Sequence, residues 1–240
     1  MRVKAVIAYN GSHYKGFQKQ KSTQNTITHA IEKVLRTLKI DATIVASGRT
    51  DAGVHASNQV IHFDVPEYWN DVEKLKLNLN RKLDDIAFKH ISAVSNDFHA
   101  RFSAKKRLYR YVFKTKKPSV FEQSYISHYE DFDKKLLVDA LQLFKGKHDF
   151  NFFRRTGTET HTTQREIYYT NYIERSGYHF IYFQANGFLR SQVRMMVDAA
   201  MLCAKGKLTQ KQLFEQISCQ HKYTTKLAPP EGLYLAKILY

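Results

Sequence analysis

The chain has 240 residues and a mass of 28.1 kDa, enough for one large domain or two small ones with a buried core, which excludes a miniprotein held together by disulfides or metals. Apolar residues make up 43% and charged residues 25%, as in globular proteins, so a wholly disordered or fibrous chain is also excluded. Lys and Arg outnumber Asp and Glu by 38 to 22, a net charge of +16. This excess favours a polyanionic partner; a basic chain without such a partner is the alternative.

The two cysteines, Cys203 and Cys219, encode neither a disulfide framework nor a thiolate metal site, and they fit a reducing compartment. The apolar run 5–8 is too short for the core of a signal peptide, and no later stretch is long enough to span a membrane. We therefore predict a soluble, cytoplasmic protein.

Strand and helix patterns alternate along the first half of the chain. The apolar run 3–9 predicts a strand, and the helical spacing of apolar residues over 27–38 predicts an amphipathic helix with Ser22 or Thr23 as its N-cap. Further patterns predict strands over 43–47 and 60–65, a helix over 71–83 and a strand over 86–94.

The second half repeats this order of elements. Its patterns predict a strand over 108–113, a helix over 136–144, a hairpin of 166–173 and 179–184 that turns at Ser176-Gly177, a helix over 189–202 and a strand over 233–239. We predict an α+β fold with helices packed on one side of a sheet, in two related halves that join near residues 100–107 with a cleft between them.

Several cofactor and metal motifs are missing from the sequence. Gly11 and Gly16 have the spacing of a phosphate-binding loop, but Phe17 and Gln18 stand where Lys and Ser or Thr are needed. No two of the eleven histidines lie three to five positions apart, and there is no Cys-x-x-Cys. We therefore expect no nucleoside triphosphate site and no metal.

Positive charge and aromatic rings are combined in the segment 98–121, which has no acidic residue. Its cations are Arg101, Lys105, Lys106, Arg107, Arg110, Lys114, Lys116 and Lys117. Because cations bind phosphates and flat rings stack on bases, the pattern is typical of proteins that bind single-stranded or looped RNA. A core strand with a solvated basic face is the alternative, since alternation puts Tyr109, Tyr111 and Phe113 on one face.

A loop of small and polar residues, Ser47-Gly48-Arg49-Thr50-Asp51-Ala52-Gly53-Val54-His55-Ala56, lies between two predicted strands. Such a loop can bring backbone, a cation and the Asp51 carboxylate close to a ligand, although Asp51 could also be an ordinary turn residue ahead of Gly53.

Two arginines, Arg190 and Arg194, lie four residues apart on the predicted helix 189–202. Their like charges repel unless an anion lies between them. The alternative is that Arg194 pairs with Asp198 and Arg190 is solvated.

These segments together resemble the tRNA pseudouridine synthase A family. The most specific similarity is Gly48-Arg49-Thr50-Asp51-Ala52-Gly53-Val54-His55, which resembles the family's signature loop. Further segments similar to family motifs follow in order along almost the whole chain, at residues 9–20, 97–104, 106–111, 186–194 and 228–235.

The resemblance implies the pseudouridine synthase fold, with two α+β halves over residues 1–104 and 105–240 whose mainly antiparallel sheets join at a basic central cleft. It implies a homodimer that isomerises uridine to pseudouridine at nucleotides 38, 39 and 40 of the anticodon stem-loop of tRNA, without a cofactor. Asp51 would be the catalytic nucleophile or base, Arg194 its cationic partner, and Tyr109 the ring beneath the uracil.

In the same resemblance, Arg49 would fill the space that the extruded base leaves. The phosphate contacts would come from Arg101, Lys105, Lys106, Arg107, Arg110 and Arg190. Two other functions stay open at this point: a pseudouridine synthase acting at other RNA sites, and a non-catalytic RNA-binding protein on the same scaffold.

Overall fold

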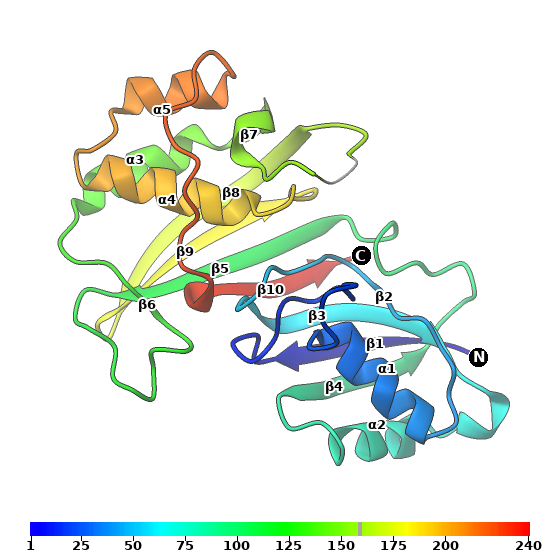
Figure 1. The fold of residues 1–240 in the computed structure, drawn as a ribbon. Coiled ribbons are helices and arrows are strands. Elements are labelled where there is room, and N and C mark those ends of the chain that lie inside the picture. The colour runs from blue at the N-terminus through cyan, green and yellow to red at the C-terminus, as the bar shows by residue number, and fades with distance from the viewer. Residues whose placement is uncertain (158–159) are drawn as a thin grey trace. The chain divides into compact units, whose positions relative to one another are not determined.

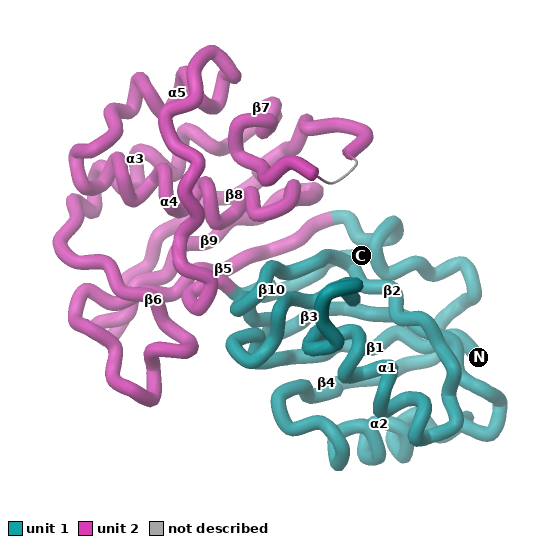
Figure 2. The backbone as a smooth tube through the Cα atoms, in the orientation of Figure 1, with its two compact units in different colours: residues 1–105, 234–240 teal, residues 106–233 magenta. Residues whose placement is uncertain are grey.

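The computed structural model describes residues 1–157 and 160–240 and divides them into two compact units, drawn in Figure 1 and coloured separately in Figure 2. Unit 1 comprises residues 1–105 and 234–240, and unit 2 comprises residues 106–233. Each unit has its own strands and helices.

Unit 1 combines a mainly antiparallel sheet with two α-helices. Its elements are β1 (Arg2–Tyr9), α1 (Ile27–Thr37), β2 (Val45–Ala46), β3 (His55–Asp64), the 3-10 helix η1 (Glu67–Trp69), α2 (Val72–Asn80), β4 (Ile86–Ala93) and β10 (Leu233–Leu239). The strands lie in the order β4-β1-β3-β10, with β2 paired to β3. β1 is antiparallel to β3 and β4, whereas β10 runs parallel to β3.

Unit 2 has the same kind of architecture. Its elements are β5 (Lys106–Lys114), β6 (Ser127–His128), α3 (Lys134–Leu143), β7 (Gly146–Asp149), η2 (Asn151–Phe153), β8 (Gln164–Arg175), β9 (Tyr178–Ala185), α4 (Gln192–Ala204), α5 (Gln210–Ile217) and η3 (Pro230–Gly232). The strands lie in the order β5-β9-β8-β7 and are antiparallel, while β6 runs parallel to β5. The prediction of an α+β fold is confirmed.

The predicted periodicities correspond to buried faces. Ile27, Ile31 and Leu35 of α1 are almost completely buried, because their spacing puts them on one side of the helix. The cap prediction was wrong: Thr26 caps α1, since it directly precedes the first helical residue and its hydroxyl oxygen accepts the N–H of His29.

Strand β5 shows the alternation expected from the sequence. Tyr109, Tyr111 and Phe113 are buried on one face, and β9 pairs with β5 along its length. The hairpin of β8 and β9 turns at Ser176 and Gly177, which have φ angles of 51° and 76°. This confirms the predicted turn, because consecutive left-handed residues fit the twist of a tight hairpin.

Some elements differ from those predicted. Helix α4 begins at Gln192 and not at Leu189, because Ser191 has a left-handed φ of 59° and the N–H of Leu189 donates to the Gln192 side chain at 2.8 Å. Helix α5, which was not predicted, has only eight residues and buries few apolar side chains; Thr209 and Gln212 close a capping box at its start.

The C-terminal strand belongs to unit 1, whereas the sequence-based division places residues 105–240 together. β10 pairs with β3 at Tyr234–His55, and the Lys105 N–H donates to the Leu239 carbonyl at 2.8 Å. A pairing between strands so far apart in the chain leaves no local pattern. The predicted joining of the two sheets and the predicted central cleft both involve the two units at once, and they remain predictions.

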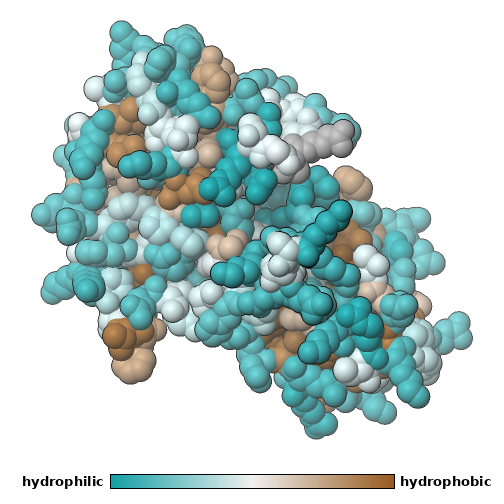
Figure 3. All heavy atoms as spheres, viewed as in Figure 1, coloured by the Kyte–Doolittle hydropathy of each residue, from teal (hydrophilic) through white to brown (hydrophobic). Residues whose placement is uncertain are grey.

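The visible face of the molecule is largely hydrophilic, and its hydrophobic residues form small separate groups (Figure 3). No helix in the described ranges is both long and apolar enough to cross a bilayer.

Two buried histidines, His62 in unit 1 and His179 in unit 2, make stability depend on pH. Burial is the main cause that lowers the pKa of both side chains. The Nδ1 atom of His62 accepts the Ala100 N–H at 3.1 Å, which requires the neutral ring. Because each folded pKa lies below the unfolded value of about 6.5, the stabilisation is complete above that pH and is lost as the pH falls through the folded pKa.

We therefore predict a lower urea midpoint of unfolding at pH 5 than at pH 7.5. In His62→Asn, the amide oxygen can accept the Ala100 N–H without titrating, so the difference between the two midpoints should shrink. Equal midpoints of the wild-type protein at both pH values would contradict this account.

Candidate active site

The loop of residues 47–54 connects β2 to β3 in unit 1 and carries Arg49 and Asp51. Asp51 is half-buried and Arg49 is exposed. The Val54 N–H donates to the Asp51 carbonyl at 3.2 Å and closes a tight turn. Within that turn Gly53 has a φ of 77°, a conformation that favours glycine.

The segment that follows β1 packs directly against this loop. The buried Tyr9 hydroxyl is hydrogen-bonded to Oγ1 of Thr50 at 2.8 Å, and the Phe17 N–H donates to the Thr50 carbonyl at 3.1 Å. Both the backbone and the side chain of the residue before Asp51 are therefore held in place.

Two glycines allow this close approach. A Cβ atom on Gly11 would lie 2.0 Å from the Val54 carbonyl oxygen, and one on Gly16 would lie 3.2 Å from that of Thr50. Gly16 also has a φ of 110°. The Gly11 N–H donates to Nδ1 of His55 at 3.0 Å. These two glycines do not form a phosphate-binding loop. Instead, they let the segment after β1 pack closely against the loop of residues 47–54.

The opposite side of the loop is held by the strand that follows it. The buried Gln59 side chain of β3 accepts a hydrogen bond from the Ser47 hydroxyl at 2.6 Å and donates one to the Gly48 carbonyl at 2.7 Å. The His55 ring stacks on Tyr234 of β10, with centroids 4.7 Å apart. Asp51 thus lies on a support fixed on two sides.

The remaining predicted residues of unit 1 are exposed cations. Nη1 of Arg49 donates to the Gln18 side chain at 2.9 Å. Arg101 and Lys105 lie in the segment after β4. The structure therefore brings Arg49 and Asp51 together in one loop and places Arg101 and Lys105 in another segment.

Tyr109 and Arg194 belong to unit 2. Tyr109 lies in β5 opposite Phe183, is 8% exposed, and meets the Phe188 ring edge-on with centroids 5.1 Å apart. Arg194 lies in the first turn of α4. Its Nε donates to the Ala228 carbonyl at 2.7 Å, and the Ala228 N–H donates to the Arg194 carbonyl at 3.1 Å.

The sequence suggested Arg194 as a partner of the nearby Asp198, but the structure gives Asp198 a different one. Its carboxylate accepts a hydrogen bond from the Thr224 hydroxyl at 3.1 Å. Burial raises the pKa of Asp198. These contacts do not support the interpretation that Arg194 simply pairs with Asp198.

The segment 228–232, which holds Arg194, is itself packed closely on β5 and β6. A Cβ atom on Gly232 would lie 2.6 Å from both the Val112 carbonyl oxygen and the Ser127 hydroxyl. The buried Tyr111 hydroxyl donates to the Pro229 carbonyl at 3.0 Å. The position of the Arg194 guanidinium therefore depends on the close packing that Gly232 allows, just as the position of Asp51 depends on the close packing at Gly11.

Basic residues of unit 2 lie in β5 and around the loops that flank β8 and β9. Nη1 of Arg190 donates to the Thr156 carbonyl at 3.3 Å, and the Arg155 N–H donates to the Arg190 carbonyl at 3.1 Å. The predicted residues in β5 are Lys106, Arg107 and Arg110. Nη1 of Arg107 donates to the Asn186 carbonyl at 2.7 Å, and Nζ of Lys106 lies 4.8 Å from the centroid of the Tyr168 ring.

Sequence reasoning missed several of these residues. Arg155 lies directly beside Arg190, and the Arg154-Arg155 pair was the signal that could have indicated it. Gln59 supports the loop of Asp51, and so does Tyr9, which lies in a segment similar to a family motif but was given no role from the sequence. A glutamine on the inward-facing side of an apolar strand, as at position 59, indicates a buried amide with specific partners.

Chemically, unit 1 presents a carboxylate on a fixed loop, and unit 2 presents an aromatic ring and a guanidinium on a strand and a helix. Within residues 1–157 and 160–240, no group of three or more His, Cys, Asp or Glu side chains is arranged to hold a metal ion.

A family model of known proteins matches two ranges of the chain. The family described as tRNA pseudouridine synthase matches residues 5–103 and 140–240. The matched ranges contain Asp51 and Arg194, while Tyr109 lies between them.

Relatives match over their full length. The chain is 36% identical to tRNA pseudouridine synthase A of Campylobacter jejuni subsp. jejuni serotype O:6 over 241 residues, covering 100% of both chains. It is 38% identical to tRNA pseudouridine synthase A of Helicobacter hepaticus, and the match covers 99% of this chain and 98% of the relative. It is 36% identical to tRNA pseudouridine synthase A of Geobacillus sp. strain WCH70, and this match covers 100% of this chain and 98% of the relative. The chain belongs to the tRNA pseudouridine synthase family, as the resemblance predicts.

Among solved structures, the archaeal box H/ACA sRNP Nop10-Cbf5 complex matches 83% of this chain and 43% of that chain, at 9% identity and a TM-score of 0.36. The family assignment rests on the sequence matches.

The close approach at Gly11 can be tested by adding one methyl group. We predict that Gly11→Ala lowers the free energy of unfolding by about 1–3 kcal/mol, because the new Cβ would overlap the Val54 carbonyl and force the loop away. Gly187→Ala is the control, since its Cβ would meet only the Arg165 side chain, at 3.6 Å. Thermal unfolding measures both variants; equal melting temperatures would contradict the predicted clash.

Proposed function

We propose that the protein isomerises uridine to pseudouridine in tRNA, at nucleotides 38, 39 and 40 of the anticodon stem-loop. The observation that carries the proposal is the loop of Asp51, which lies in the matched family range and is held on two sides. The matched relatives are named tRNA pseudouridine synthase A. The net charge of +16 supports an RNA substrate, whose phosphates attract cations.

The reaction requires a fixed carboxylate. The bond between N1 of uracil and C1′ of ribose breaks, the base turns, and a bond between C5 and C1′ forms; the proton on C5 is removed and N1 gains one, so substrate and product are isomers. An ionised carboxylate can serve as the nucleophile or as the base in such a step. We assign this role to Asp51.

Arg194 and Tyr109 complete the proposed catalytic set. Because its Nε is bonded to the Ala228 carbonyl, the Arg194 guanidinium has a defined plane, which suits it as the cationic partner of a carboxylate. The Tyr109 ring, set by the edge-on contact with Phe188, would support the uracil by stacking.

Substrate binding would combine base extrusion with phosphate contacts. Removing a base from its stack costs a few kcal/mol. We propose that Arg49 occupies the vacated space, and that phosphates are bound by Arg101, Lys105, Lys106, Arg107, Arg110 and Arg190. Each neutralised phosphate would add to the salt dependence of binding.

We also propose that the protein acts as a homodimer in the cytoplasm, as the family resemblance implies. Light scattering of the purified protein should give twice the chain mass of 28.1 kDa. A single-chain mass at micromolar concentration would contradict the dimer without affecting the reaction.

The role of Asp51 is tested by Asp51→Asn, which keeps the shape of the side chain and removes its charge. We predict that pseudouridine formation in a tRNA transcript falls at least about 1,000-fold, while the affinity for tRNA changes little. Nucleoside mass spectrometry measures the product, and filter binding measures the affinity.

The matched control is Asp41→Asn, because Asp41 is an exposed aspartate of the same unit. It should retain wild-type activity. Appreciable pseudouridine from Asp51→Asn would remove Asp51 from the mechanism, and pseudouridine only at other positions of the transcript would move the proposed target site.

The role of Arg194 is tested by comparing activity with stability. Arg194→Ala should lower turnover about 100-fold or more, as loss of one electrostatic group in an active site does. Loss of the hydrogen bond to Ala228 should cost about 1.5–3 kcal/mol of stability. Arg175→Ala, at an exposed arginine of the β8–β9 hairpin, is the control. Unchanged turnover with a lowered melting temperature would show that Arg194 has only a structural role.

A further inference from the structure

A turn between β4 and β5 presents an exposed aromatic ring on unit 1. The Phe102 side chain is 76% exposed, although it stacks on the His99 ring with centroids 4.3 Å apart and planes 29° apart. The Arg101 guanidinium carbon lies 5.5 Å from the Phe102 ring centroid. The turn therefore joins two stacked rings and a cation at the surface.

The turn is closed by hydrogen bonds among its own residues. Nδ1 of His99 accepts the N–H groups of Arg101 and Phe102, each at 3.2 Å. The His99 N–H donates to the Ser103 hydroxyl at 3.1 Å, and the Ser103 N–H donates to the His99 carbonyl at 2.9 Å. The backbone of the turn and the His99 ring are thus fixed before any ligand binds, and the Phe102 ring stacks on the His99 ring.

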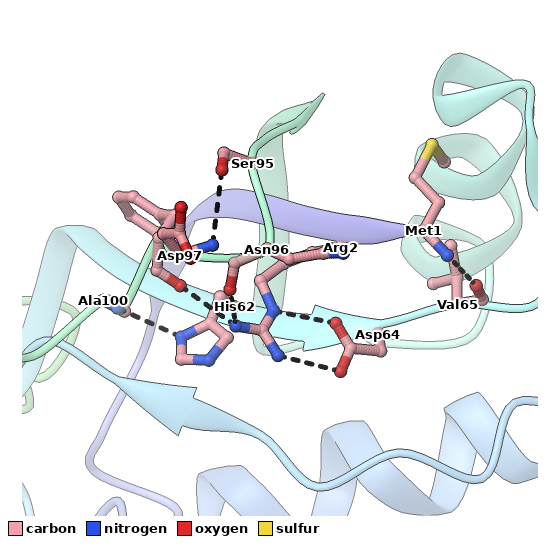
Figure 4. A network of polar contacts seen from close by, with 10 residues as sticks. Met1, Arg2, His62, Asp64, Val65, Ser95, Asn96, Asp97 and Ala100 are labelled. Carbon is pink, nitrogen blue, oxygen red and sulfur yellow. Dashed lines mark hydrogen bonds and ion pairs between the residues drawn. The ribbon is translucent and has the colours of Figure 1, made fainter.

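The turn is also anchored to the sheet, as Figure 4 shows. Arg2 of β1 donates to the Asn96 and Phe98 carbonyls, while the Asp64 carboxylate binds the same guanidinium at 2.9 and 3.1 Å. The Ala100 N–H donates to the His62 ring of β3. Two strands therefore support the segment that presents Phe102.

More cations and rings lie around the same segment. Nζ of Lys4 lies 5.7 Å from the Phe98 ring centroid and 5.9 Å from that of Tyr240. These two rings are 5.1 Å apart. Isolated exposed apolar residues are common and need no function, but a rigid turn that pairs an exposed ring with cations has the composition of a nucleotide site.

We propose that the His99–Phe102 ring pair is a stacking platform for an unpaired base of the RNA substrate. The proposal rests on the proposed function and adds a specific contact to it. A base offers the flat π-face that Phe102 can stack on, and its phosphate suits the neighbouring Arg101. An anionic RNA suits the two cations of this surface, Lys4 and Arg101, better than a second copy of the same basic turn does.

The experiment compares Phe102→Leu, which removes the ring, with Phe102→Trp, which keeps one. Phe121→Leu is the matched control, because Phe121 is 87% exposed and lies in unit 2. Affinities are measured for a substrate tRNA transcript, for single-stranded oligouridine and for an RNA duplex of the same length, and kcat and KM are measured with the transcript.

We expect Phe102→Leu to bind the transcript and oligouridine about 5- to 100-fold more weakly than the Phe121→Leu control does. Duplex affinity should not change, KM should rise with little change in kcat, and Phe102→Trp should restore binding. The melting temperature should stay close to that of the wild type, since the ring is exposed.

Unchanged affinity of Phe102→Leu for oligouridine would overturn the platform. An equal loss for duplex RNA would also overturn it, because stacking requires an unpaired base. A change of oligomeric state without a change of RNA affinity would identify a protein contact instead. If the wild type binds oligouridine through Phe102 but forms no pseudouridine, the proposed function fails and the platform stands.

Discussion

The contact between the segment after β1 and the loop of residues 47–54 is the constraint on which the site depends. Tyr9 and Phe17 hold Thr50 from one side, and Gln59 holds the start of the loop from the other. A carboxylate that attacks or deprotonates one atom of a nucleoside must be placed to within a fraction of an ångström. Backbone hydrogen bonds on a sheet provide this placement better than a free loop would.

In unit 2, Arg194 is positioned by close packing of a similar kind. Gly232 lets the segment 228–232 lie against β5 and β6, and Ala228 in that segment holds Arg194 through two hydrogen bonds. In unit 1 Gly11 lets the chain pass close to Val54. In both units a glycine at a close backbone approach positions a charged side chain. These glycines contact nothing chemically reactive, so their importance follows only from the packing.

Periodicity and turn chemistry were enough to predict most elements, because α1, β5 and the β8–β9 hairpin bury one regular face or turn at a characteristic dipeptide. The parallel pairing of β10 with β3 was not predictable, since it joins opposite ends of the chain. The family resemblance indicated Asp51 and Arg194. The supporting roles of Gln59 and Ala228 were not indicated, although Ala228 lies in one of the segments similar to family motifs, because their hydrogen bonds form only in the folded chain.

Amide hydrogen exchange of the RNA-free protein tests most directly whether the loop of Asp51 is organised before substrate binds. The N–H groups of Phe17 and Val54 donate to the carbonyls of Thr50 and Asp51. They should therefore exchange far more slowly than unstructured peptides of the same sequence. Exchange of both amides at the unprotected rate would show that the loop is open in the free protein and would contradict the account.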